Sequence, residues 1–159
     1  MTIPSDYVQR HILRHTYALI AWAILNLTVG GVGMFFSAGL LHHFLHMNAA
    51  WGSVNLVVGL ILWYSTTQTT TPGSALSRSR QFRKVLLINI FLDSTYLMAG
   101  LWLLKKGTLA GEYAAYFTGF GYSVLLQGAV LLLFDLLSIH LLHRHKNVRS
   151  QERQVAEAG

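Results

Sequence analysis

The sequence predicts an all-α fold, a four-helix transmembrane bundle made of two helical hairpins. Composition is the first reason: 53% of the 159 residues are hydrophobic and 11% are charged, whereas a soluble domain is about 25% charged. The second reason is that four stretches are apolar over roughly the 20 residues that a helix needs to cross about 30 Å of hydrocarbon. A chain of this length forms one domain, and without cysteine it has neither disulfides nor thiol chemistry.

The first span is expected at 17–36. Gly30, Gly31 and Gly33 lie inside a full-length apolar run that follows a long N-terminal flank. These features favour an uncleaved membrane anchor over a secretory signal peptide, whose apolar region is shorter. Asn26 places one amide side chain near the middle of this span.

The second span is expected at 49–66 and contains Asn55. Before it, residues 40–47 place Leu41, Phe44 and Leu45 among histidines, a pattern typical of a short helix lying on the outer membrane surface. Aromatic residues near the predicted span ends are interpreted as a belt at the level of the lipid headgroups. These residues are Trp51, Trp63, Trp102, Tyr7, Tyr17 and Tyr64.

The third span is expected at 85–104, after a cytoplasmic linker at 67–84. The linker prediction rests on a run rich in serine and threonine that contains Pro72-Gly73 and favours turns over helix. Within the span, Asn89, Asp93 and Tyr96 recur at the spacing that places side chains on one helical face.

The fourth span, expected at 116–142, is the longest, so we expect it to tilt or to project beyond the bilayer. Residues 145–159 are predicted to form a cytoplasmic tail. Gln127 and Asp135 share one stripe of this span with Leu131. Gly119 and Ser123 are spaced by four, which lets helix backbones approach closely. We therefore expect tight packing in the outer half of the bundle and a wider polar cavity towards the cytoplasm.

The basic residues predict the orientation of the chain. Ten of the 12 lysines and arginines lie before the first span, at 78–84 or from Arg144 onwards, and only Lys105 and Lys106 lie on the other side. Basic flanks are retained in the cytoplasm, so both termini and the linker should be inside. The net charge of +6 then reflects topology and contact with anionic lipid. Nucleic-acid binding is not expected, because the basic residues are split among three flanks without a binding module.

Asp93 and Asp135 are acids within apolar spans. From the helical rise, they lie about 13 Å and about 10 Å from the cytoplasmic ends of their spans, so their carboxyl groups can share a depth. An acid in mid-span costs about 2.5 to 3.5 kcal/mol, so it faces the bundle interior and finds partners there. One hypothesis is that these acids bind and release a proton, a cation or a small amphiphile. The other is that they stay protonated, because burial disfavours charge, and fix helix register by hydrogen bonding.

The candidate ligand-binding residues are therefore the polar groups inside the spans. They are Asp93, Asp135, Asn89, Tyr96, Gln127, Asn26 and Asn55.

Eight histidines suggest a cofactor hypothesis. His15 and His140 are best placed to clamp a haem near the cytoplasmic interface, and His42 and His46 lie one helical turn apart, as a metal pair would. However, no histidine lies deep in a span, and an interfacial histidine is often an amphipathic side chain with a solvated tip. The cofactor therefore stays unknown, and a haem- or metal-binding redox subunit is an alternative function.

No enzymatic activity is expected. The sequence shows no phosphate-binding glycine loop and no Ser-His-Asp constellation, since Asp135, Ser138 and His140 do not share one helical face. The leading hypothesis is a non-enzymatic integral membrane protein, in contact with the lipid bilayer and self-associating as a homo-oligomer, with a polar seam that binds a small ligand. The remaining alternative is a structural accessory subunit of a larger membrane complex.

Several motifs in the last three spans resemble a family of small four-span bacterial integral membrane proteins of uncharacterised function. The resemblance implies a four-span fold and a multi-pass protein of the bacterial inner (plasma) membrane, and it carries no activity. It directs attention to Asn55, Asp93, Tyr96, Gln127 and Asp135. The motifs are Asn48-Ala49-Ala50-Trp51-Gly52-Ser53-Val54-Asn55, Leu92-Asp93-Ser94-Thr95-Tyr96 with Gly100, Gly119-Phe120-Gly121, Gln127-Gly128 and Phe134-Asp135.

Overall fold

A computed structural model of the protein describes residues 5–68 and 75–158. The described residues form four long helices and contain no strand, which confirms the predicted all-α four-helix fold. The long helices are α1 (Ser5–Gly33), α2 (Gly39–Gln68), α3 (Ala75–Gly107) and α4 (Ala114–Ala158), and two short 3-10 turns are η1 (Met34–Phe36) and η2 (Gly111–Tyr113).

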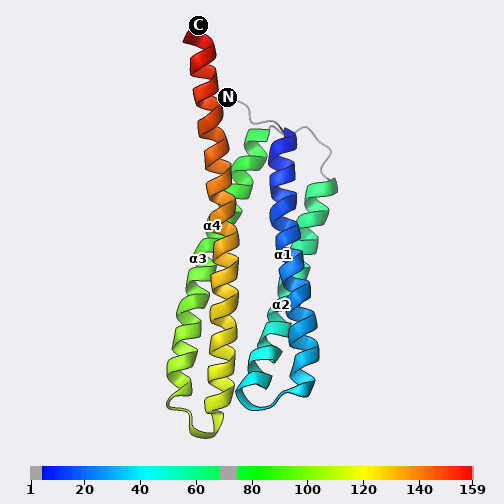
Figure 1. Ribbon diagram of the computed structural model, residues 1–159, viewed down its shortest axis with the longest axis vertical. Helices are drawn as coiled ribbons and strands as arrows, with labels where there is room; N and C mark the ends of the chain where they lie inside the picture. Colours follow the sequence, from blue (N-terminus) through cyan, green and yellow to red (C-terminus); the bar gives the residue numbers. More distant parts are fainter. Residues whose placement is uncertain (1–4, 69–74, 159) are drawn as a thin grey trace.

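The helices form two antiparallel hairpins, α1 with α2 and α3 with α4 (Figure 1). The 3-10 turns η1 and η2 lie in the two hairpin connections, at the lower end of Figure 1. Gly39 and Gly111 have φ angles of 57° and 52°, in the left-handed region that favours glycine. These two glycines allow each hairpin to reverse direction within a few residues.

The two ends of the bundle carry different connections. α1 begins, α4 ends and α2 leads into α3 at the upper end of Figure 1, which we call the terminal end. The opposite end, with η1 and η2, is the hairpin end. Arg10, Arg14 and Arg83 lie towards the terminal end, whereas Lys105 and Lys106 lie in the last turn of α3 at the hairpin end. The basic flanks seen in the sequence therefore lie mainly at the terminal end, and the two lysines Lys105 and Lys106 lie at the hairpin end.

The predicted spans 49–66, 85–104 and 116–142 lie inside α2, α3 and α4, which extend beyond them, whereas the span predicted at 17–36 begins inside α1 and ends in η1. Residues 40–47, predicted as a separate surface segment, are instead the first turns of α2, where His43 and Phe44 pack against Gly119 of α4. Residues 75–84 of the predicted linker form the start of α3. The remainder of the Pro72-Gly73 linker, residues 69–74, lies outside the described residues.

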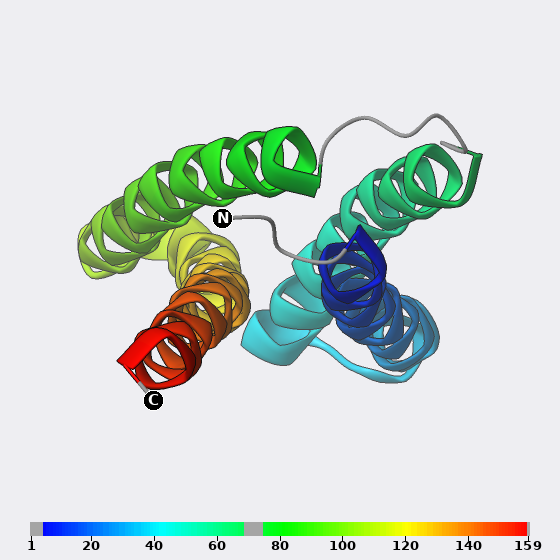
Figure 2. The same ribbon diagram turned by 90° about the horizontal axis from the view of Figure 1, so that it is seen from above.

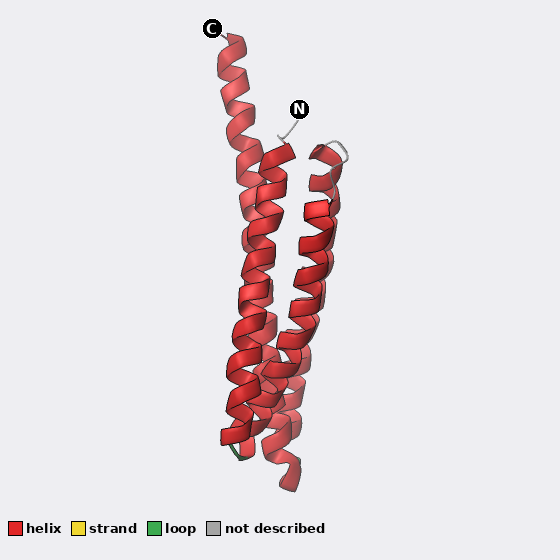
Figure 3. Ribbon diagram, turned by 90° about the vertical axis from the view of Figure 1, so that its right-hand side faces the viewer, coloured by secondary structure: helices red, strands yellow, loops and turns green. Residues whose placement is uncertain are grey.

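α4 continues as a helix through the predicted tail to Ala158, and only residue 159 of that tail lies outside the described residues. Its 45 residues correspond to a length of about 67 Å at 1.5 Å per residue, more than twice the thickness of about 30 Å of a hydrocarbon core. Figure 3 shows its final turns rising above the other helices.

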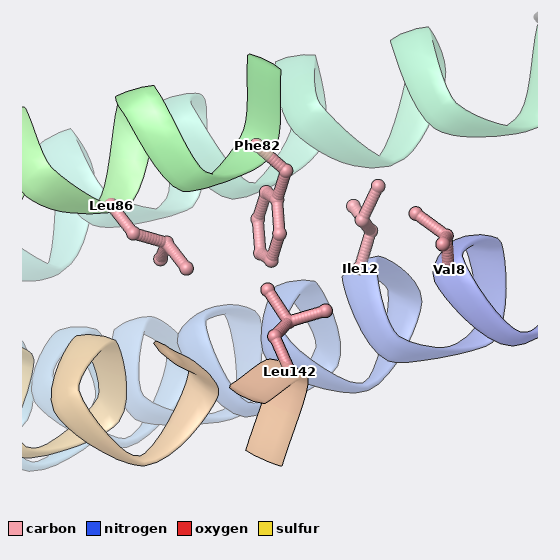
Figure 4. Packing of buried hydrophobic residues seen from close by; sticks show 5 residues of the cluster. All are labelled: Val8, Ile12, Phe82, Leu86 and Leu142. Atoms are coloured by element: carbon pink, nitrogen blue, oxygen red, sulfur yellow. The ribbon is translucent and has the colours of Figure 1, made fainter. Parts of the chain in front are cut away.

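The two hairpins lie side by side (Figure 2) and pack differently at the two ends. Towards the hairpin end, backbones touch: a Cβ atom on Gly119 would lie 2.6 Å from the carbonyl oxygen of Leu40. Towards the terminal end, side chains fill the space between α1, α3 and α4 (Figure 4). This apolar cluster consists of Val8, Ile12, Phe82, Leu86 and Leu142.

The molecule has an apolar exterior and a polar interior. Large apolar side chains such as Val32, Phe91 and Leu133 face outward, with exposed fractions of 60%, 72% and 54%. Asparagine, glutamine and aspartate side chains are buried instead. Each helix contains a window long and apolar enough to cross a membrane, within Tyr7–Phe36, Gly39–Gln68, Ser77–Gly107 and Gly111–Arg144.

Candidate functional site

A cavity of about 160 Å³ lies between the helices, and all four of them line it. It is partly open at the side between α2 and α3, where its lining includes exposed apolar side chains such as Val54 and Leu92. We call it the acidic cavity. Its polar lining consists of His15 from α1, Trp51 and Asn55 from α2, Asn89, Asp93 and Tyr96 from α3, and Asp135 from α4. Its apolar lining consists of Leu19, Val54, Val58, Leu92, Leu131 and Phe134.

Asp93 and Asp135 bring two carboxyl groups to this cavity. Each residue is only 3% exposed, and the two carboxyl groups are close enough to interact electrostatically. Asn89, one turn before Asp93, has a side-chain hydrogen-bonding interaction with Asp135. The face that the spacing of Asn89, Asp93 and Tyr96 predicts is therefore the face of α3 that lines the cavity.

His15 connects the cavity to a second buried imidazole. Its Nε2 atom lies 3.4 Å from Asp135 Oδ1, and its Nδ1 atom shares a hydrogen bond of 2.8 Å with Ser138 Oγ. One turn earlier on α1, His11 Nε2 donates to the carbonyl oxygen of Ser138 at 3.1 Å, because a carbonyl oxygen can only accept. The Phe82 ring packs edge-on against both imidazoles. We call His11, His15 and Ser138 the histidine ladder.

Three buried polar atoms at the acidic cavity have no hydrogen-bond partner among the described residues. They are Trp51 Nε1, Asn55 Nδ2 and Asp93 Oδ2. An indole N–H can only donate, and an ionised carboxylate can only accept. A buried polar group without a partner costs about 1–3 kcal/mol, and native interiors contain few. Three residues that line the cavity thus carry two unpartnered donors and one unpartnered acceptor.

A second polar cluster lies nearer the hairpin end, with Gln127 of α4 at its centre. Gln127 Nε2 donates to Asn26 Oδ1 at 2.7 Å and to Asn48 Oδ1 at 2.8 Å. Its Oε1 atom accepts from Trp22 Nε1 at 2.8 Å, and Ser123 Oγ donates to Asn48 Oδ1 at 2.9 Å. We call these five residues the amide network. It joins α1, α2 and α4, and it contains no charged group.

The structure divides the predicted ligand-binding residues between these two clusters. The single polar seam that the sequence suggested is therefore two separate sites. Asp93, Asp135, Asn89, Tyr96 and Asn55 line the acidic cavity, whereas Asn26 and Gln127 belong to the amide network.

The predicted haem pair is not brought together. His15 is buried, whereas His140 is exposed. Because two residues turn a helix by about 200°, His140 lies on the side of α4 away from Ser138, whose hydroxyl contacts His15.

The other predicted metal pair lies near the hairpin end. The rings of His42 and His46 have centroids 6.1 Å apart, but His42 Nδ1 donates to the carbonyl oxygen of Met34 at 2.8 Å. That nitrogen is therefore not free to bind a metal in this arrangement. Across the described parts of the chain, no three His, Asp or Glu residues are grouped to hold a metal ion.

Trp51 is a site residue whose position the sequence analysis misassigned. Its ring does not belong to a surface belt but packs edge-on against Tyr96, with centroids 4.8 Å apart, and lines the acidic cavity. α2 begins at Gly39, so Trp51 lies about three turns inside the helix. The missed signal was Gly39 itself, a glycine suited to the turn that starts this helix.

The structure also assembles a Ser-His-Asp group that the sequence does not reveal. Ser138 and Asp135 lie on one face of α4, and their histidine is His15, which is 123 residues from Ser138 along the chain. The helical offsets exclude His140 from this group, and His140 is exposed; a histidine from α1 could not be predicted for the position. Ser138 is 6% exposed, and the described lining of the acidic cavity does not include it.

The comparisons with known proteins add a family but no activity. Residues 18–136 match a family of unknown function, DUF6992. This segment includes the amide network and both cavity acids, while His11, His15 and Ser138 lie outside it. No curated protein and no solved structure matches the chain. Because the match spans most of its length, the chain belongs to the family of unknown function DUF6992.

Proposed function

We propose that this protein is a non-enzymatic, multi-pass membrane protein that takes up and releases a proton at the Asp93–Asp135 pair. One observation carries the proposal: two buried carboxyl groups share a cavity that also presents unpartnered donors and an unpartnered acceptor. Buried polar atoms without hydrogen-bond partners cost stability, and ionisable residues in such buried environments concentrate at functional sites.

Membrane insertion is supported by the outward-facing apolar side chains and by the four long apolar helices. An acid within the hydrocarbon region is expensive and marks a proton or ion pathway by default. The basic residues at the terminal end support an orientation with both termini in the cytoplasm. For a bacterial protein the corresponding membrane is the inner membrane.

The donors in the cavity favour a proton over a bare cation. A metal cation such as Mg²⁺ is surrounded by oxygen ligands, whereas the residues that line this cavity include Trp51 and Asn55, each with an unpartnered N–H donor. Two adjacent acids do not ionise together readily, so they can share one proton. A water molecule can hydrogen-bond to donors and acceptors alike, and one water needs only about 10–15 Å³ of cavity volume. The cavity of about 160 Å³ therefore has room for several.

Infrared spectroscopy of the protein in lipid nanodiscs tests the proposal. Among the carboxylic-acid C=O bands that titrate with pH, we expect one that shifts or weakens in Asp93→Asn and in Asp135→Asn and that stays unchanged in Glu112→Gln. Glu112 is an exposed acid at the hairpin end and serves as the matched control. A wild-type spectrum without a titrating band would overturn the proposal, as would titrating bands that are all unchanged in both aspartate variants.

The Ser-His-Asp group favours a hydrolase as the second candidate. Against it, a hydrolase needs an accessible serine and N–H donors for the oxyanion, whereas Ser138 is buried in the middle of a continuous helix. A serine-directed phosphonate probe distinguishes the two functions. Covalent labelling of the wild type that is lost in Ser138→Ala would establish the hydrolase, and an unlabelled wild type with a titrating carboxyl band would establish the proton site.

A further inference from the structure

We propose that the acidic cavity exchanges protons with only one end of the bundle, the terminal end, and that His15 carries each proton between Asp135 and that end. The inference rests on the proposed function and adds the end of the bundle with which protons are exchanged. It follows from the difference between what lies on the two sides of the cavity along the bundle axis.

On the hairpin side, the amide network leaves no group to carry a proton. Gln127 is fully buried at 0% exposure, and its amide donates twice and accepts once within the network. The backbones are also in contact there. A Cβ atom on Gly52 of α2 would lie 2.9 Å from the carbonyl oxygen of Ala23 on α1. A proton leaving the cavity in this direction meets a layer of satisfied neutral groups and packed backbone.

On the terminal side, beside the apolar cluster, an imidazole connects the cavity to further buried polar groups. The two ring nitrogens of His15 contact different partners, Asp135 at 3.4 Å and Ser138 Oγ at 2.8 Å. An imidazole can accept a proton at one nitrogen and release one from the other. His11 lies one turn further towards the terminal end, and the half-buried ring of Tyr7 stacks on it at 6.2 Å between centroids. Tyr7, His11 and His15 thus continue along one face of α1.

Proton release from Asp135 and proton uptake need no reactant other than water. In the release step, the O–H bond of protonated Asp135 breaks and the proton bonds to His15 Nε2, which leaves a carboxylate and an imidazolium. The imidazolium loses its Nδ1 proton to Ser138 Oγ, whose own hydroxyl proton passes to a water molecule and on towards the terminal end. His15 is then neutral with its proton on Nε2. Uptake runs the same steps in reverse and restores the first tautomer.

The charged and titratable groups around His15 come from three helices. α1 provides His11, next to which Arg14 acts electrostatically. α4 provides Asp135, while α3 provides Asp93 and Tyr96 to the same cavity. The residues that α2 contributes to the described lining, including Trp51 and Asn55, do not titrate. Within the described lining, His15 is therefore the residue that contacts both an acid, Asp135, and the ladder residue Ser138.

The experiment measures the sidedness of proton exchange in proteoliposomes. The chain contains no cysteine, so Gln68→Cys at the terminal end and Leu109→Cys at the hairpin end report, through an impermeant thiol reagent, which end faces outward. Both positions are exposed and lie outside the cavity. After a rapid pH jump in the external solution only, time-resolved infrared spectroscopy follows the carboxyl band.

We expect the rapidly responding fraction of the band to equal the fraction of molecules labelled at Gln68→Cys. In His15→Gln the equilibrium titration of the band should persist, while its relaxation slows about tenfold or more, as for loss of a proton-transfer group. His140→Gln, an exposed histidine on α4, should leave the rate unchanged.

A response that follows the fraction labelled at Leu109→Cys, or that comes from all molecules alike, would overturn the inference. So would a His15→Gln rate equal to the wild-type rate. In both cases a titrating band would leave the proposed function intact, whereas the absence of any titrating band would overturn the proposed function. The sidedness measurement uses wild-type cavity residues, so it decides the question even if His15→Gln does not fold.

Discussion

The amide network and the acidic cavity lie close together on α4, yet their hydrogen bonding differs completely. Gln127 and Asp135 are about 12 Å apart along the helix axis, and both are buried among apolar helices. At Gln127 every hydrogen-bonding group of the amide has a partner. At the cavity, three buried polar atoms have none among the described residues. The polar residues of one bundle therefore form one cluster whose central amide is fully hydrogen-bonded and one cluster with unpartnered atoms.

The difference follows from the side chains that each cluster contains. Amides carry donors and acceptors in equal measure, so a few of them can satisfy one another without charge. In the acidic cavity the donors of Trp51 and Asn55 make no hydrogen bond to Asp93 Oδ2, so the network there stays incomplete. A complete buried network makes the core rigid, whereas an incomplete one costs stability. The comparison predicts that substitutions in the two regions have different effects on stability.

The largest expected effect on stability is in the amide network. Gln127→Leu should lower the free energy of unfolding by about 2–4 kcal/mol, because it leaves the acceptor of Asn26 and the donor of Trp22 without partners and removes one of the two hydrogen bonds to Asn48. Unfolding in mixed micelles of increasing dodecyl sulfate content measures this loss. Leu126→Ala, at a partly exposed neighbour, should cost less than half as much. A Gln127→Leu variant as stable as the wild type would contradict a structural role for the network.

A smaller loss is expected where the two hairpins touch. Gly119→Ala should destabilise the protein by about 1–3 kcal/mol, since the added methyl group would meet the backbone of α2 at Leu40 and Phe44 and overpack the contact. Gly31→Ala is the matched control, because a Cβ atom there meets nothing within 4 Å. The same unfolding assay should find that control neutral or slightly more stable. Equal effects at both glycines would mean that α2 and α4 are not in backbone contact.

The smallest effect on stability is expected at the cavity. Asp93→Asn should change the free energy of unfolding by no more than about 1 kcal/mol, and in the stabilising direction, because it removes a buried ionisable group that lacks a full set of partners. The infrared titration of the same variant should nevertheless be altered. Loss of stability as large as that of Gln127→Leu would place Asp93 among the structural residues and remove the contrast between the regions.

Helical periodicity was sufficient to predict the face of α3 that lines the cavity. Asn89, Asp93 and Tyr96 recur at the helical period, and no other information is needed to place them together. Helix starts were harder to predict. Arg80, Arg83 and Lys84 are good helix formers, but a polar helical turn beyond the apolar region has the same hydropathy as a linker. For the same reason the second span was predicted to start at 49 although α2 begins at Gly39, and Trp51 was therefore placed at a span end.

Contacts between distant segments could not be predicted in this way. Periodicity identifies the face of a helix but not its partner, so Gln127 and Asp135 were assigned to one seam although they meet different neighbours. The contact between His15 and Ser138 joins α1 to α4 across 123 residues of sequence. It depends on how the two hairpins pack, which a single sequence does not encode in any local pattern.

The most direct test is the infrared titration of the double variant Asp93→Asn/Asp135→Asn beside the wild type in lipid nanodiscs. The four other Asp and Glu residues contribute alike to both spectra. If the cavity holds an exchangeable proton on its acid pair, the difference between the wild-type and double-variant spectra contains a titrating C=O band, while the helical content stays the same. Identical titrating bands in the wild type and the folded double variant would contradict the account.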